Sequence, residues 1–73
     1  MTIKYRELDF SLANRLLIVS WPKKEIKVFL ELNETRNHID WSWATGADTP
    51  QSRHIAGLMK SAGYWYLDRV LPS

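Results

Sequence analysis

The sequence predicts an α+β domain, in which an antiparallel sheet of about four to five strands carries one helix over residues 50–62. Three observations lead to this fold class. Apolar and polar residues alternate over residues 25–32, which is the period of a strand with one buried face. Over residues 50–62 the apolar residues recur instead at helical spacing. Clusters of turn-forming residues divide the rest of the chain into short elements.

The first two strands are predicted from changes in apolar pattern. Residues 2–10 predict an edge strand with a bulge or break near Glu7, because the apolar positions change parity there. Residues 15–20 are apolar on both parities, which favours a strand buried on both faces or central in the sheet. The dipeptide Trp21-Pro22 then predicts a turn, since proline fixes its own φ and lacks an N–H for pairing.

The next two strands are predicted from alternation. In residues 25–32, four apolar side chains share one face, and Phe29 is the exception on the other face. These four are Ile26, Val28, Leu30 and Leu32. In residues 38–43, the apolar face is predicted to comprise Ile39, Trp41 and Trp43, opposite His38, Asp40 and Ser42. The polar link 33–37 would allow the two strands to pair, although a helix over residues 38–46 is an alternative.

The helix over residues 50–62 has signals at both ends. Thr49 or Asp48 can cap it, and Pro50 suits its first turn. Its apolar stripe has the spacing i, i+3, i+4 and i+7 and comprises Ile55, Leu58, Met59 and Ala62. The opposite face is predicted to carry Arg53, Gly57, Lys60 and Ser61. Gly63 is predicted to end the helix, and residues 64–71 are predicted to form a closing strand.

An alternative fold comes from a resemblance to a known family. The stretch Thr49–Leu71, with its Thr-Pro start, helix, Ala-Gly-Tyr and strand, resembles the recognition helix and wing of winged-helix DNA-binding domains. The resemblance covers 23 of the 73 residues. It implies helices at about 24–33 and 38–45, whereas the alternation in these segments favours strands.

Composition restricts the class of protein. The 73 residues are predicted to form a single small globular domain, 1–73, with 45% hydrophobic and 25% charged residues. A domain of this size has marginal stability unless something reinforces it. Because the chain has no cysteine, disulfides and thiolate metal sites are excluded. Burial of its four Trp, three Tyr and two Phe can supply a core, and self-association is possible.

The sequence also predicts a cytoplasmic protein with no membrane partner. Its longest wholly apolar run, 16–19, is far shorter than the ~20 residues that a membrane span needs. Residues 1–7 have no apolar region typical of a signal peptide. The absence of cysteine fits a reducing compartment.

We expect no enzymatic activity, no cofactor and no metal site. The sequence contains no nucleophile elbow, phosphate-binding loop or dinucleotide fingerprint. His38 and Asp40 would share one face of a strand, but a zinc site needs three or four ligands. A polar, solvated strand face is the simpler interpretation of this pair.

The residues that we expect to bind a partner are basic or aromatic. They are Trp21, Lys23, Lys24, Arg53, Lys60, Tyr64, Tyr66 and Arg69. The lysines follow Trp21 in a turn, the helical cations lie opposite the apolar stripe, and the tyrosines would share one face of the closing strand. Each group also has a purely structural interpretation, as a soluble turn, a solvated helix face or part of the core.

Two classes of function remain open. The first is a protein-binding adaptor or inhibitor, of the kind that mobile elements (phages among them) encode, and it is slightly favoured. The alternative is a nucleic-acid-binding module with a basic helix face and exposed aromatic residues. The net charge of +2 is too small to decide between them. Cations gathered on one face would favour nucleic acid, whereas an exposed apolar patch would favour a protein partner.

Overall fold

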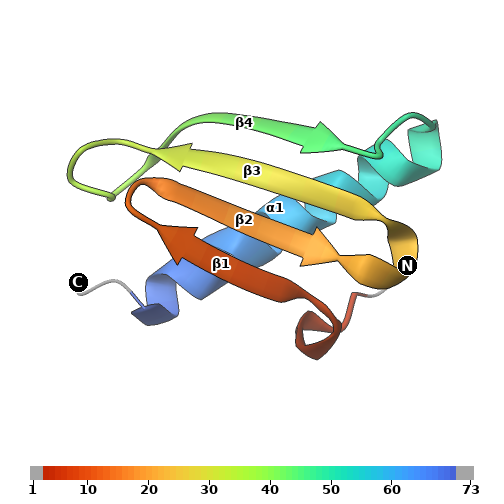
Figure 1. Ribbon diagram of the computed structural model, residues 1–73, viewed down its shortest axis with the longest axis horizontal. Helices are drawn as coiled ribbons and strands as arrows, with labels where there is room; N and C mark the ends of the chain where they lie inside the picture. The colour runs from red at the N-terminus through yellow and green to blue at the C-terminus, as the bar shows by residue number, and fades with distance from the viewer. Residues whose placement is uncertain (1–2, 71–73) are drawn as a thin grey trace.

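A computed structural model describes residues 3–70 and shows a four-stranded antiparallel sheet with one helix packed on it (Figure 1). The strands follow one another in the sheet in the order β1-β2-β3-β4. The predicted α+β fold with a helix on a sheet is therefore confirmed. The elements are η1 (Tyr5–Glu7), β1 (Asp9–Ala13), β2 (Leu16–Trp21), η2 (Pro22–Lys24), β3 (Ile26–Leu32), β4 (Ile39–Thr45) and α1 (Pro50–Val70).

The pairing register determines which side chains face the helix. Leu17 pairs with Leu30 and Val19 with Val28, so these four side chains point to the same face of the sheet. All four are buried beneath α1, which packs mainly against β2 and β3. The other parity of β2 is only half-buried, so of the two predicted alternatives the structure confirms a strand inside the sheet rather than one buried on both faces. One face of the sheet is the core, and the other has no helix over it (Figure 1).

The helix begins where its cap predicts. The backbone N–H of Ser52 donates to Thr49 Oγ1 at 3.0 Å, and the N–H of Thr49 donates to Ser52 Oγ at 2.8 Å. These reciprocal bonds satisfy backbone donors that the first turn leaves unpaired. The predicted apolar stripe is confirmed, with Ile55, Met59 and Ala62 buried and Leu58 half-buried.

The predicted end of the helix was wrong. α1 continues past Gly63 to Val70, so the closing strand over residues 64–71 is absent up to Val70, and Leu71 lies outside the described residues. Gly63 is a packing position, because a Cβ there would overlap Leu30 Cδ1. Leu67 continues the buried stripe four residues later. Burial of this second half outweighs the strand preference of the aromatic residues that it contains.

The predicted N-terminal edge strand and its break near Glu7 are confirmed, but the predicted bounds, residues 2–10, were wrong. The parity change near Glu7 marks the short 3-10 turn η1, and β1 begins only at Asp9. From there β1 runs to Ala13 and pairs with β2, while Thr2 lies outside the described residues. The helices that the winged-helix alternative requires are absent, since β3 and β4 occupy these segments.

Residues 3–70 contain no helix that is both long enough and apolar enough to cross a lipid bilayer.

Candidate protein-binding surface

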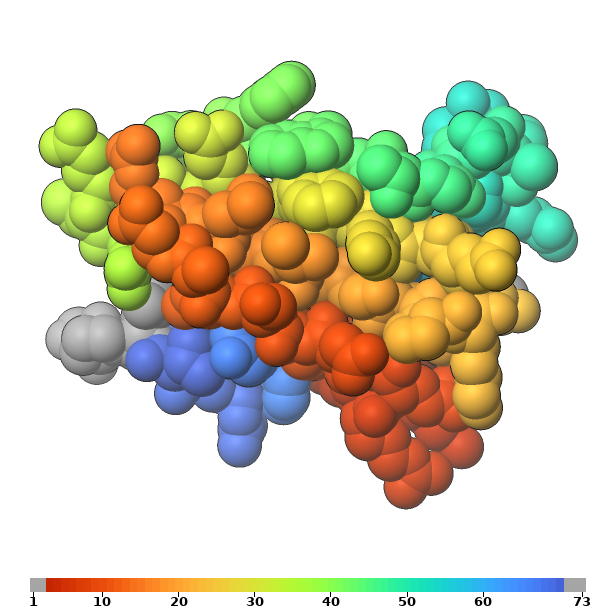
Figure 2. All heavy atoms as spheres, viewed as in Figure 1, coloured from red at the N-terminus to blue at the C-terminus, as the bar shows by residue number. Residues whose placement is uncertain are grey.

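The face of the sheet opposite α1 carries large apolar side chains, and no other element within residues 3–70 covers them. Figure 2 shows this face, with the strands in front and parts of α1 visible at the margins. The register places five apolar side chains on it: Leu16, Ile18, Phe29, Trp41 and Trp43. A soluble sheet with one solvated face normally alternates apolar and polar residues more cleanly than this. We refer to this surface as the open face.

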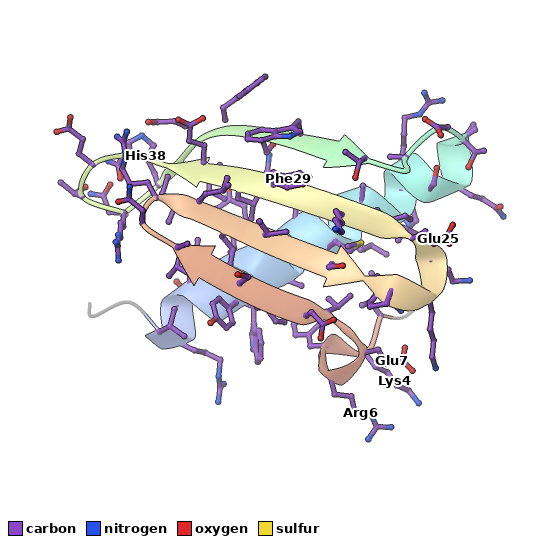
Figure 3. The ribbon with its side chains drawn as sticks, in the orientation of Figure 1. Lys4, Arg6, Glu7, Glu25, Phe29 and His38 are labelled. Carbon is purple, nitrogen blue, oxygen red and sulfur yellow. The ribbon has the colours of Figure 1, made fainter. Side chains whose placement is uncertain are left out.

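Three aromatic rings form a continuous row across β3 and β4. The rings of Phe29 and Trp43 are stacked, with centroids 5.2 Å apart and planes 7° from parallel. Trp41 packs against Trp43 at 4.8 Å with a tilt of 36°. Figure 3 labels Phe29 in the middle of the sheet. Trp41, at the end of this aromatic row, is 62% exposed, so most of its large apolar surface lies in solvent despite the contact with Trp43.

A bulge in the sheet produces this arrangement. Glu31 pairs with Trp41, but the next residue of β3, Leu32, pairs with Ile39, which leaves Asp40 as the extra residue. Ile39 therefore turns toward the core side with Leu32, while Trp41 stays on the open face. The prediction that Ile39, Trp41 and Trp43 share one face was wrong for Ile39.

The charges on the open face are mixed. Lys27 and Glu31 flank Phe29 on β3, and Asp9 lies on the same face of β1. A hollow of about 290 Å³ beside Trp43 adds one further cation, Arg15, next to Glu31. It is lined by Ala13, Asn14, Arg15, Leu16, Glu31 and Trp43. The apolar patch is therefore bordered by both signs of charge rather than by a cluster of cations.

Of the aromatic residues predicted to bind a partner, only Tyr64 is mainly exposed. Trp21 lies in the core, and its buried indole N–H has no acceptor among the described residues. Tyr66 stacks on Phe10 with centroids 4.6 Å apart. Tyr64 and Tyr66 lie on α1 rather than on a strand, so they do not share a face as predicted. Tyr64 is 47% exposed, but its ring packs against no other aromatic ring among the described residues.

The five predicted cations do not form one surface. Lys23 and Lys24 lie in η2, whereas Arg69 lies at the far end of the molecule, near the end of α1 (Figure 1). Lys23 Nζ is 3.8 Å from Glu7 Oε1, and Arg69 lies over the Trp65 ring at 4.9 Å. Arg53 and Lys60 stand on α1, away from the open face. The structure thus brings no three of these residues together.

His38, which directly precedes β4, and Asp40 within β4 lie together. His38 Nε2 lies 2.8 Å from Asp40 Oδ1, and both side chains are largely exposed. No third His, Cys, Asp or Glu among residues 3–70 joins them in a group that could hold a metal ion. The same histidine contacts Asn37 Oδ1 through Nδ1 at 3.1 Å.

The central residues of this surface, Phe29, Trp41 and Trp43, were not among the predicted partner-binding residues. One signal was present in the sequence: Phe29 is the single apolar exception on the polar face of a clearly alternating strand. An apolar residue in that position has either a partner on the same face or an exposed binding function. The Trp residues gave no such signal, because alternation alone assigned them to the buried face.

The comparisons with known proteins give no further guide. The chain matches no family model, and neither a curated protein nor a solved structure shows significant similarity to it.

Proposed function

We propose that this protein functions by binding another protein, with the open face of its sheet as the contact surface. The observation that supports this is the aromatic row of Phe29, Trp41 and Trp43 on the open face, in which Trp41 is mainly exposed and the other two rings are half-buried. Interfaces concentrate their binding energy in a few residues, among which Trp is enriched. A continuous apolar patch that is left in solvent is typical of a protein interaction site.

The geometry of the rings favours a protein over a nucleic acid. Single-stranded nucleic acids bind by inserting bases against free aromatic faces, with cations along the backbone. Here Trp43 is packed between Phe29 and Trp41, so its ring has little free face to offer a base. The phosphates would meet Glu31 and Asp9 as well as Lys27. These features are better suited to a partner that covers the whole patch with apolar side chains.

An adaptor or inhibitor needs no chemistry beyond such a surface. It acts by occupying its target, and the affinity follows from a desolvated centre surrounded by polar residues. The mixed charges of Lys27, Glu31 and Arg15 would form that surrounding rim. The sequence is free of cysteine, which is compatible with the cytoplasmic location that we propose.

The first test compares matched aromatic substitutions. The double variant Trp41→Thr, Trp43→Thr removes the exposed rings but keeps residues that favour a strand. Tyr64→Thr removes an exposed aromatic residue from the helix and serves as the control. Proteins retained by the immobilised wild type would be identified by quantitative mass spectrometry and then purified for calorimetry. We expect a specific partner that binds the wild type and Tyr64→Thr but binds the double variant at least tenfold more weakly.

A titration with nucleic acid tests the alternative function. Tryptophan fluorescence would be followed while single- and double-stranded DNA is added at low and moderate salt. Binding that weakens steeply with salt would report phosphate contacts, at a log–log slope of about 0.9 per contact for duplex DNA. If the double variant lost that binding too, the proposal of a protein partner would be wrong.

A further inference from the structure

The outer edge of β4 is available for pairing with another strand. β4 is the last strand of the sheet, and no turn or loop residue in the described chain forms a backbone hydrogen bond with residues 40–45. Natural sheets protect exposed edges with Lys, Pro or a covering element. Ile39–Thr45 contains neither Lys nor Pro, and its only charge, Asp40, sits in the bulge. This edge also borders Trp41 and Trp43 on the open face.

A groove runs along the other side of the same edge, between β4 and α1. α1 packs mainly on β2 and β3, and on the core side of β4 Ser42 is only half-buried and Ala44 is exposed. The groove has a volume of about 170 Å³, below the ~300–1,000 Å³ typical of small-molecule sites. It is lined by Val28, Ser42, Trp43, Ala44, Ala56, Gly57 and Lys60. Four of these seven residues are small (Ser42, Ala44, Ala56 and Gly57), and a Cβ on Gly57 would meet nothing within 4 Å.

We infer that the protein partner supplies an extended segment that pairs with β4 as a fifth strand. This inference rests on the proposed function and names the kind of segment that would bind. Addition of a strand to a sheet edge gives affinity through backbone hydrogen bonds and specificity through pockets for alternate side chains. Alternate residues of the added strand face opposite sides of the sheet. One set therefore enters the groove beside Ser42 and Ala44, and the other lies beside Trp41 and Trp43.

The shape and charge of the groove indicate which side chains the partner's extended segment carries. Its apolar walls and small volume fit one aliphatic side chain such as Leu, Ile, Val or Met. Lys60 stands on its wall, half-buried, and no acidic side chain among residues 3–70 forms an ion pair with it. A carboxylate close to the aliphatic residue would pair with this ammonium group. The partner segment is thus an extended peptide with one aliphatic residue and an Asp or Glu nearby.

A second copy of this chain fits the groove less well. Antiparallel pairing of two β4 strands about Ser42 would bring Ser42 and Ala44 of the other copy to the groove side. Both side chains are short, so the groove would stay unfilled. It would also bring no acidic residue except Asp40, which already contacts His38.

The test uses a phage-displayed library of random dodecapeptides selected on the full-length protein. We expect the enriched peptides to share an aliphatic residue with Asp or Glu within two positions. Synthetic copies would be labelled, and their binding measured by fluorescence anisotropy. Hydrogen exchange should show β4 amides becoming protected when the peptide binds, with β1 amides unchanged.

Two groove variants make the experiment specific. Gly57→Leu fills the groove and improves helix propensity, so it should fold and bind the peptides at least tenfold more weakly. Ser61→Leu places the same residue one turn further along α1, outside the groove, and should bind as the wild type does. Lys60→Glu should weaken binding of the acidic peptides. It should restore binding of synthetic peptides in which the Asp or Glu has been replaced by Lys.

The outcomes separate this inference from the proposed function. In one outcome, the selected peptides fail to bind the variant Trp41→Thr, Trp43→Thr and yet bind Gly57→Leu normally. That result would contradict binding in the groove and would still agree with binding at the open face. Failure of the library to yield an enriched peptide, or enriched peptides that leave the β4 amides unprotected, would also overturn this inference. A dimer of the free protein in light scattering, with β4 amides protected, would assign this edge to a second copy instead.

Discussion

The two edge strands, β1 and β4, belong to the same sheet, but α1 covers their core-side faces to different extents. Under β1, Phe10 stacks on Tyr66 at 4.6 Å and also contacts Trp65, which packs on Tyr5 at 4.8 Å. Under β4 there is no such cover, and Ser42 and Ala44 border a groove. The difference arises in α1, whose second half packs Trp65 and Tyr66 beside β1, whereas its first half places Ala56, Gly57 and Lys60 beside β4. A single helix can thus close one edge of a sheet and leave the other accessible.

The largest expected loss of stability comes from removing the aromatic contact between β1 and α1. Phe10→Ala deletes a half-buried ring together with its stacking contact, and we expect it to lower the free energy of unfolding by about 2 kcal/mol. Trp41→Ala, on the open face beside β4, should cost only ~0.5–1 kcal/mol, since its ring is mainly in solvent. Urea denaturation followed by circular dichroism measures both. If both variants lost the same free energy of unfolding, the difference in packing between the two edges would be contradicted.

The two glycines of α1 should respond in opposite directions. Gly63→Ala overlaps Leu30, which is fully buried, so we expect a net loss of about 1 kcal/mol despite better helix propensity. Gly57→Ala meets open space beside β4 and should raise stability by ~0.5–1 kcal/mol. Thermal unfolding of the pair checks this. Destabilisation by Gly57→Ala would mean that the groove is closed in solution.

The start of α1, on the β4 side, should depend on its own cap. Thr49→Ala removes the acceptor for the Ser52 N–H, and we expect a loss of ~0.5–1 kcal/mol. Thr49→Asp retains an acceptor and is the matched control. Amide exchange at residues 51–53 should rise in the alanine variant alone. If it does not, packing rather than capping holds this end of the helix.

The smallest effect is expected at Lys60. If this side chain serves binding rather than folding, Lys60→Ala should change the free energy of unfolding by no more than ~0.5 kcal/mol. The same denaturation experiment measures it. A loss above ~1 kcal/mol would indicate that the aliphatic part of Lys60 supports the wall of α1 and is structural.

Periodicity predicted the fold well where burial is one-sided. The alternation over residues 25–32 identified β3, and the stripe from Ile55 to Ala62 identified the contact face of α1. It failed at Gly63, since a glycine at a tight helix–sheet contact looks the same in sequence as a helix-ending glycine. It failed again at Ile39, because the bulge depends on how β3 and β4 pair. The open face was not predicted, since Trp41 and Trp43 alternate as core residues do and only Phe29 departs from the pattern of its strand.

The strand order has a consequence for how the chain folds. Each strand pairs with its neighbour in sequence, so the sheet can assemble from hairpins without closing long loops. Hairpins form in about 1–10 μs, and topologies rich in local contacts fold quickly. The core side of β2 and β3 stays in water until α1 docks through Gly63 and Met59. We therefore expect docking of the helix to be the step that makes folding cooperative and commits the sheet to its register.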